Sequence, residues 1–295
     1  MGHINDALHI RLVGAPVEEG AGRPGCALGP QALRAAGIGA ALGAADLGDV
    51  APRPSRPLCH GNAALKALPE VSAWTEALAE AALAASDGGL PVFLGGDHSL
   101  SAGTVTGLAR RAAEAGRPLF LLWLDAHPDF HTLDTTTSGN LHGTPAAYAT
   151  GRPGFEGYFP ALAAPVDPRR VCMLGVRSVD PAEARALAEA GVAAHGVRGM
   201  GRALAAFLAR VAAEDGLLHV SLDVDFLDPG LAPAVGTTVP AGASRRAALA
   251  AMDRLRASGR VTSLDVVELN PRLDRGGRTA RLMVELVARL MGDRR

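Results

Sequence analysis

Cysteine is scarce in this sequence. Three of its 295 residues are cysteines, and Cys26, Cys59 and Cys172 lie far apart without any Cys-x-x-Cys spacing. A disulfide framework or a zinc–thiolate site would need paired or closely spaced cysteines. We therefore expect three reduced thiols in a cytoplasmic protein.

The sequence also lacks a strong charge imbalance and long hydrophobic runs. The formal net charge is −1 at pH 7, and no cluster of Lys and Arg is interleaved with aromatic residues, so nucleic acid is not an expected partner. No apolar run approaches the roughly 18 residues that a membrane-spanning helix needs, so we expect no membrane partner. The first residues, Met-Gly-His-Ile-Asn-Asp, contain no basic stretch followed by an apolar one, which argues against a secretory signal.

Hydrophobic residues are plentiful, at 48% of the chain, which is ample for a large core. Apolar, strand-like runs alternate with stretches rich in Ala, Leu and Arg, a pattern typical of βαβ units. We expect strands at His9–Gly14, Pro91–Leu94, Pro118–Leu124, Arg170–Gly175, Leu217–Leu222 and Val261–Val266. We expect helices at Gln31–Ala36, Val71–Ala85, Thr104–Ala115, Pro181–Ala190, Arg202–Glu214, Arg245–Ala257 and Arg278–Met291.

The run Leu119–Leu124 is apolar on both faces, which is typical of a parallel strand covered by helices on each side. We therefore predict an α/β fold, a single three-layer α/β/α domain over residues 1–295 with a mostly parallel sheet. Residues 131–160 and 228–242 are rich in Gly, Pro or Thr and follow strands. Because ligands of open α/β sheets bind beyond the carboxyl ends of strands, we expect active-site loops there.

Three short segments concentrate His and Asp at alternating positions beside strand-like runs. They are Gly-Gly-Asp-His-Ser at 95–99, Asp-Ala-His-Pro-Asp at 125–129 and Ser-Leu-Asp-Val-Asp at 221–225. Side chains at i, i+2 and i+4 of an extended segment share one side. Carboxylates buried at strand ends are costly, or take up a proton, unless cations hold them. The segments therefore predict a site for two divalent metals, with ligands His98, Asp125, His127, Asp129, Asp223 and Asp225.

Imidazoles and carboxylates without thiolate favour Mn²⁺ first, then Co²⁺, Fe²⁺ or Zn²⁺. Each motif alone has a simpler interpretation: turn capping for residues 125–129, a glycine-rich turn before a helix for 95–99, and a salt-bridged loop for 221–225. Asp97, beside a ligand, can orient that ligand or cap a helix. Because all three motifs stand at expected strand ends of one chain, we favour the metal site.

On these residues the chain resembles the arginase–agmatinase superfamily, the ureohydrolases. The resemblance continues through Thr-Thr-Thr-Ser-Gly-Asn-Leu-His-Gly at 135–143, Arg-Ser-Val-Asp-Pro at 177–181, Gly-Thr at 236–237 and Leu-Asp-Val-Val-Glu-Leu-Asn-Pro at 264–271. It spans essentially the whole chain, and the stretch Ser-Gly-Asn-Leu-His-Gly is closer to arginases proper than to agmatinases or formimidoylglutamases. The resemblance implies an enzyme that hydrolyses the guanidinium group of L-arginine to L-ornithine and urea.

The resemblance also implies two Mn²⁺ ions per subunit with a hydroxide between them as the nucleophile. One ion would be bound by His98, Asp125, Asp129 and Asp223, and the other by Asp125, His127, Asp223 and Asp225. Asp125 and Asp223 would bridge the pair. A homo-oligomer, trimer or hexamer, is implied as well.

Three further roles follow from the resemblance. Glu268 would hold the planar guanidinium through paired hydrogen bonds. His142 would pass a proton to the leaving amine. Asp129 would count among the catalytic residues as well as among the metal ligands.

The small-molecule guanidino substrate would be recognised by the long loop. Thr136 and Ser138 would bind an α-carboxylate, Asp180 and Glu183 would receive an α-ammonium, and Thr237 would accept a hydrogen bond from the guanidinium. We expect the two tryptophans to serve packing, and His219 to be a satisfied histidine in the core or at a strand edge.

One substrate-binding position departs from the usual family pattern. Arginases usually place Asn two residues after the last aspartate of the Asp-x-His-x-Asp motif, and this chain has His131. Imidazole can still donate to a carboxylate, so we expect His131 in the substrate pocket, with a surface loop position as the alternative. Leu133 also departs, and so does Asp134, which is expected to bring negative charge near the carboxylate-binding end.

Other functions stay open on the sequence alone. The same chemistry could act on agmatine, guanidinobutyrate or N-hydroxy-arginine. The protein could also be a metal-binding homologue without catalysis, although the full ligand set argues against that. A two-metal phosphoesterase is disfavoured, because the chain lacks the usual Asn-His ligand pairing and a cationic clamp for phosphate.

Overall fold

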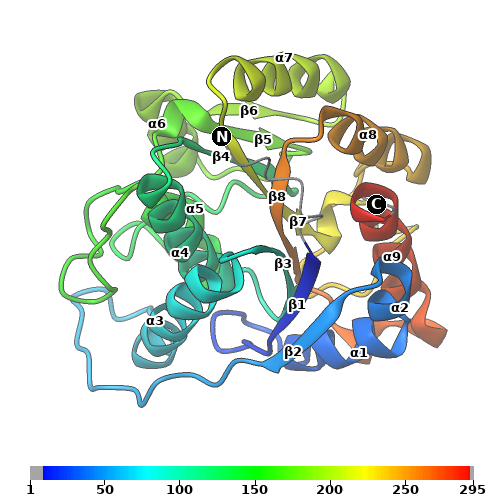
Figure 1. Cartoon of the computed structure of the whole chain (residues 1–295). Helices are drawn as coiled ribbons and strands as arrows, with labels where there is room; N and C mark the ends of the chain where they lie inside the picture. The colour runs from blue at the N-terminus through cyan, green and yellow to red at the C-terminus, as the bar shows by residue number, and fades with distance from the viewer. Residues whose placement is uncertain (1–8, 293–295) are drawn as a thin grey trace.

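One eight-stranded sheet forms the centre of the computed structural model, which describes residues 9–292 (Figure 1). The strand order is β2-β1-β3-β8-β7-β4-β5-β6, and every pairing is parallel. The strands are β1 (His9–Ala15), β2 (Ala45–Asp49), β3 (Gly89–Gly95), β4 (Leu119–Leu124), β5 (Val171–Leu174), β6 (Ala193–His195), β7 (Leu217–Asp223) and β8 (Val261–Val267). The predicted parallel α/β fold is confirmed.

Helices cover both faces of this sheet (Figure 1). The helices are α1 (Gly29–Ala35), α2 (Ile38–Leu42), α3 (Leu68–Ala85), α4 (Leu100–Glu114), α5 (Pro145–Ala149), α6 (Pro181–Ala190), α7 (Met200–Ala213), α8 (Arg245–Ser258) and α9 (Arg278–Met291). None of these described helices is long and apolar enough to span a membrane. The prediction of one domain over residues 1–295 includes the ends 1–8 and 293–295, which lie outside the described residues.

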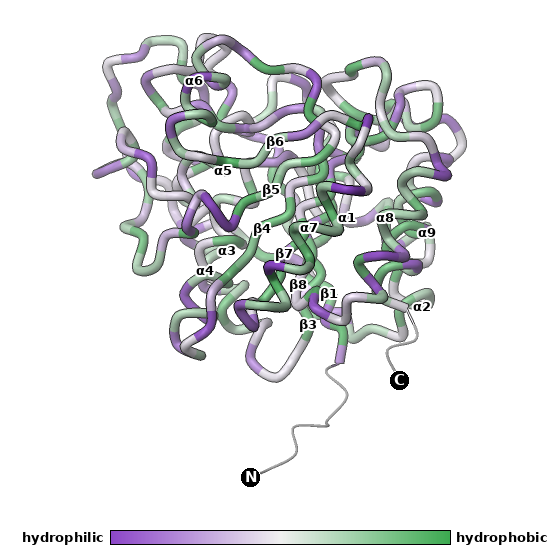
Figure 2. Tube along the Cα trace, turned by 90° about the horizontal axis from the view of Figure 1, so that it is seen from above, coloured by the Kyte–Doolittle hydropathy of each residue, from purple (hydrophilic) through white to green (hydrophobic). Residues whose placement is uncertain are grey.

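The two faces of β4 show how the three layers are held together. Phe120, Leu122 and Leu124 belong to the core cluster that contains α1, α2, α7, α8 and α9. Leu119, Leu121 and Trp123 belong to the cluster that contains α3, α4, α5 and α6. Alternate residues of one strand therefore anchor opposite helical layers, and hydrophobic colour runs along the central strands in Figure 2.

Six strands and seven helices were expected from the sequence, and each is present within a few residues of its expected bounds. The expectation missed β2 and β6, the two edge strands, and the short helices α2 and α5. Every residue of β2 and of β6 is exposed. A strand with no buried face carries no hydrophobic pattern, so these two strands could not be predicted from periodicity.

The order of the central strands decides where function can reside. Strands β3, β8, β7 and β4 are adjacent, so their carboxyl ends lie side by side at one edge of the sheet. The chain leaves these strands directly into residues 96–99, 268–271, 224–228 and 125–131. All three His/Asp segments and Glu268 are thereby brought to one place.

Candidate metal centre and substrate pocket

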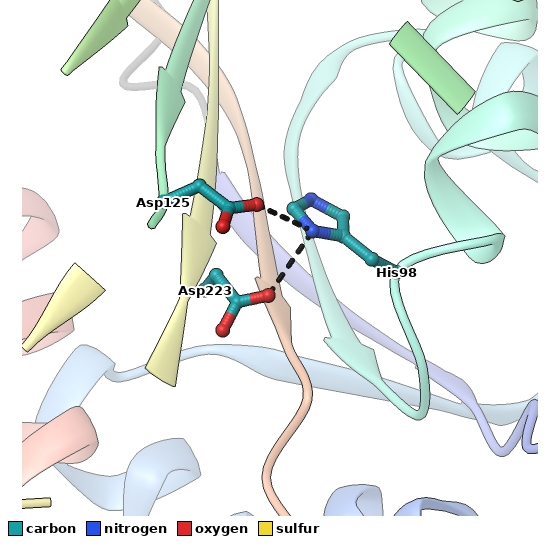
Figure 3. A group of neighbouring side chains, drawn as sticks. All are labelled: His98, Asp125 and Asp223. Carbon is teal, nitrogen blue, oxygen red and sulfur yellow. Dashed lines mark ion pairs between the residues drawn. The ribbon is translucent and has the colours of Figure 1, made fainter. Parts of the chain in front are cut away.

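The first group of ligands gathers around His98, just beyond β3. Its Nδ1 lies 2.9 Å from Asp125 Oδ2, 3.0 Å from Asp129 Oδ2 and 3.1 Å from Asp223 Oδ2. Figure 3 shows the carboxylates of Asp125 and Asp223 both directed at this ring nitrogen. Within the described residues, this buried Nδ1 has no partner with hydrogen-bond geometry. Oxygens that surround a ring nitrogen without hydrogen-bonding to it fit the donor set of a divalent cation.

The second group shares one residue with the first. His127 Nδ1 lies 2.9 Å from Asp225 Oδ2 and 3.6 Å from Asp125 Oδ1. Asp125 therefore directs one carboxylate oxygen at each imidazole, the arrangement that a bridging ligand needs. Asp223 differs, because among the described ion pairs its carboxylate approaches His98 but not His127. The geometry thus supports a bridge through Asp125 more directly than one through Asp223.

The electrostatics of the cluster also call for cations. Burial and the charges of Asp225 and Asp125 hold the pKa of Asp223 well above its usual range. Burial and the charge of Asp125 raise the pKa of Asp225 to about 7. These carboxylates cannot all be ionised in a dry site unless positive charge is supplied. A pair of divalent ions would supply it.

Two neighbouring side chains, to which the sequence pattern assigned no role at the site, support the candidate metal ligands. Trp123 Nε1 donates to Asp125 Oδ2 at 3.0 Å, and its ring stacks on His98 with a centroid distance of 4.2 Å. Ser221 Oγ lies 2.7 Å from His98 Nε2. Trp123 is fully buried, as expected for packing, and its indole N–H in addition supports a candidate ligand. Trp123 stands two residues before Asp125, a spacing that puts side chains on one side of an extended segment, but the apolar run of β4 marks it first as a core residue.

Glu268 contacts both the backbone of His98, in the first group, and the side chain of His142. Its Oε1 accepts hydrogen bonds from the His98 backbone amide at 2.9 Å and from His142 Nδ1 at 2.8 Å. Its Oε2 lies 3.7 Å from the buried thiol of Cys26. Glu268 and Asp129 both have positive φ, at 65° and 48°, a backbone strain that is frequent at functional sites.

The pair of Glu268 and His142 shifts the pKa of both groups. Burial alone would raise the pKa of Glu268, but the charge of His142 and its hydrogen bond hold that pKa below the usual value. Burial alone would lower the pKa of His142, but the charge of Glu268 raises it to about 9. The pair is therefore a carboxylate beside an imidazolium near neutral pH.

The contacts of Asp97 and His219 are structural. Asp97 Oδ2 accepts hydrogen bonds from the amides of Gly20 and Ala21, and its Oδ1 accepts one from the Ser99 amide. Asp97 therefore fixes the loop after β1 rather than a metal. His219 is fully buried, with Nδ1 2.9 Å from Ser263 Oγ.

A cavity of about 250 Å³ opens above the metal ligands. With the exception of buried Asp125, all the site residues expected from the sequence line it. They are His98, His127, Asp129, His131, Thr136, Ser138, His142, Asp180, Glu183, Asp223, Asp225, Thr237 and Glu268. Asn140, Gly143, Ser178 and Val235 line it as well, and the sequence analysis gave these four no role. Asn140 and Gly143 stood inside the motif at 135–143, which was the signal for them.

His131 lies in this pocket rather than at the surface of a loop. Its Nε2 is 3.1 Å from Asp180 Oδ2 and 3.5 Å from Glu183 Oε2. Its Nδ1 is 3.1 Å from Thr135 Oγ1. Neither ring nitrogen of His131 therefore faces Thr136 or Ser138, the two residues expected to bind the α-carboxylate.

Glu183 and Asp180 sit at the first turn of α6 as a capping box. Glu183 accepts hydrogen bonds from the backbone amides of Phe130 at 3.0 Å and of Asp180 at 3.3 Å. These contacts fix Asp180 at the pocket. Asp134 does not line the cavity: its carboxylate is largely exposed and lies 3.5 Å from His60 Nε2.

Comparison with known proteins agrees over nearly the whole chain. The arginase family model matches residues 8–292. An arginase of Brucella melitensis is 61% identical over 295 residues, covering 97% of this chain and 96% of that protein. An arginase of Agrobacterium fabrum is 55% identical, covering 98% and 93%. The solved arginase from Bacillus caldovelox superposes with a TM-score of 0.88 at 34% identity, covering 97% of this chain and 99% of that one.

Proposed function

This chain belongs to the arginase family of amidinohydrolases, and from that premise we propose that it hydrolyses L-arginine to L-ornithine and urea with two Mn²⁺ ions. The observation that carries the proposal is the position of Asp125, whose two oxygens face His98 and His127. A ligand shared in this way would serve two adjacent cation sites beneath one cavity. The mixed set of imidazoles and carboxylates supports Mn²⁺ among the divalent ions.

The cations would supply the nucleophile, since binding to such ions lowers the pKa of water enough to give hydroxide near neutral pH. The first ion would be held by His98, Asp125, Asp129 and Asp223, and the second by Asp125, His127 and Asp225, with Asp223 as a second bridge. The protein's remaining task is to orient the guanidinium and to provide a proton.

Glu268 would bind the guanidinium cation. Its carboxylate lies at the cavity wall beside His98 and stays ionised, because its pKa is held low. Planar guanidinium and carboxylate groups match in paired hydrogen bonds. Thr237, on the same cavity, would accept a further hydrogen bond from the guanidinium.

His142 would protonate the leaving amine. Its Nδ1 donates to Glu268, which leaves the other ring nitrogen, Nε2, for the transfer. With a pKa of about 9, the ring holds the proton near neutral pH. A positioned acid of this kind contributes about 10²- to 10⁴-fold to rate.

The far part of the cavity supports recognition of an amino acid. Asp180 and Glu183 would receive the α-ammonium, assisted by His131, and Thr136 and Ser138 would bind the α-carboxylate. We further propose one domain over residues 1–295, a location in the cytoplasm, and a homo-oligomer.

Urea release from a panel of guanidines tests the proposed substrate. The Mn²⁺-loaded protein is expected to act on L-arginine well ahead of agmatine and guanidinobutyrate, which lack the α-carboxylate and the α-ammonium respectively. Asp180→Ala should lower kcat/KM for L-arginine by about tenfold, as expected for a lost charge-assisted hydrogen bond. Equal turnover of all three guanidines would refute L-arginine as the specific substrate, and no urea from any of them would refute the hydrolase.

A further inference from the structure

The carboxylate-binding end of the cavity has no cation of its own. Among the described residues that line the cavity, six are carboxylates, and none is a lysine or an arginine. His131, which stands where arginases usually have Asn, turns its ring nitrogens toward Thr135 and Asp180. Positive charge from a neighbouring segment would therefore favour an α-carboxylate at this end of the cavity.

Lys66, the only lysine of the chain, lies beside that end. Its Nζ donates to Asn140 Oδ1 at 2.9 Å, and Asn140 lines the cavity next to Ser138 in the same loop. The lysine comes from the stretch between β2 and α3, more than 70 residues away in the sequence. The ammonium is exposed, so its flexible stem can turn toward a ligand.

The segment that carries Lys66 is docked on the substrate loop by its backbone. The Lys66 amide donates to Gly139 O at 3.0 Å. Asn62 Nδ2 donates to Leu133 O and to Thr136 O, both at 2.9 Å. These contacts hold the segment against the loop whether or not the ammonium is present. The charge of Lys66 is therefore not required for the docking.

We propose that Lys66 is a specificity-determining residue, whose ammonium attracts the α-carboxylate of the substrate to the end of the cavity formed by Ser138 and Asn140. The inference rests on the proposed function, because it assigns a carboxylate-bearing guanidine to this site. The same charge repels a guanidine in which the carboxylate is missing and the net charge is higher. Attraction of one ligand and repulsion of the other together give specificity.

Three variants separate the charge of Lys66 from its structural contacts. Lys66→Met keeps the length of the side chain without its charge, and Lys66→Arg keeps the charge. Arg56→Met removes an exposed charge from the same stretch, at a residue whose guanidinium contacts only Gly157 O among the described contacts. The quantities to compare are KM for L-arginine and the dissociation constants of L-ornithine and 1,4-diaminobutane, which differ only in the carboxylate.

Lys66→Met is expected to raise KM for L-arginine and Kd for L-ornithine by about fivefold, with kcat nearly unchanged. Kd for 1,4-diaminobutane should stay the same or fall. Lys66→Arg and Arg56→Met should resemble the parent protein, and the effect should fade in about 1 M salt, where charges are screened beyond about 3 Å. If Lys66→Met raises Kd equally for L-ornithine and 1,4-diaminobutane, or raises neither, the proposal is overturned.

Acetylation of the single lysine gives a readout that does not depend on turnover. Acetic anhydride modifies Lys66, and mass spectrometry of its peptide follows the rate in the Mn²⁺-loaded protein. L-Ornithine should slow acetylation of Lys66, and 1,4-diaminobutane should not. If no guanidine releases urea, the proposed function fails while this comparison still decides the role of Lys66: selective protection supports it, and no protection contradicts it.

Discussion

Single residues in this site act through their neighbours as much as through their own chemistry. Asp125 illustrates the point, since it is buried beneath the cavity, faces two imidazoles and accepts a hydrogen bond from Trp123. The alternating His and Asp of the sequence predicted the ligands, because spacing by two puts side chains on one side. The role of Trp123 could not be read from the same pattern, since a tryptophan in an apolar strand is first of all a core residue.

Trp123→Phe tests the support that Asp125 receives. The substitution keeps an aromatic ring against His98 and removes the indole N–H that donates to Asp125 Oδ2. Affinity for Mn²⁺ should fall by about tenfold, the lower end of what such outer contacts contribute. Metal-buffered titration measures this affinity.

Trp74→Phe is the matched control, because Trp74 Nε1 donates to Glu19 Oε2, and neither residue is a metal ligand. It should leave the affinity for Mn²⁺ unchanged. A fall of the same size in both variants would mean that the loss in Trp123→Phe reflects general loosening of the core.

At the scale of elements, the four central strands position the candidate metal ligands and the connecting stretches line the cavity above them. The hydrophobic runs of β3, β4, β7 and β8 are continuous, so the sequence predicted these strands and the convergence of their carboxyl ends. The docking of residues 62–66 on the loop 136–140 could not be predicted. It depends on contacts between segments far apart in the chain, and local patterns carry no information about such pairs.

Gly139→Ala tests that docking. Gly139 has φ of 70°, and a Cβ there would lie 1.7 Å from the backbone oxygen of Ala64. The variant must therefore displace the segment that carries Lys66, and we expect a loss of about 2–3 kcal/mol in the free energy of unfolding. Denaturation by urea measures it.

Gly116→Ala provides the comparison, since Gly116 has a similar φ of 65° and nothing within 4 Å of an added Cβ. Its cost should be only the backbone strain of about 1–2 kcal/mol. If the two alanine variants lose equal stability, the close approach at Gly139 is not a constraint.

For the whole molecule, the proposed metal binding would be coupled to folding. The candidate ligands come from residues 98 to 225, and only the folded chain brings them within reach of one another. A cation that binds only the folded state stabilises it by about 2.7 kcal/mol at a free concentration one hundred times its dissociation constant. The protein should therefore melt at a higher temperature with Mn²⁺ than without it.

The stabilisation by Mn²⁺ should increase with pH. Carboxylates must lose their protons to bind a metal, and the pKa of Asp225 in the metal-free protein is raised to about 7 by burial and by the charge of Asp125. Protons therefore compete with Mn²⁺ increasingly as the pH falls through 7. The shift in Tm at fixed Mn²⁺ should be larger at about pH 8 than at about pH 6. Scanning calorimetry at both values measures it, and a shift that is equal or larger at the lower pH would contradict the assignment of Asp225 as a ligand.

The central claim is that two cations held around Asp125 hydrolyse a guanidinium group. The most direct test is the rate of urea release from L-arginine while Mn²⁺ is added in steps to the metal-free protein, with bound metal counted at each step. We predict that the rate rises until two ions are bound per chain and then stays constant. Full activity at one bound ion, or no urea at any loading, would contradict the account.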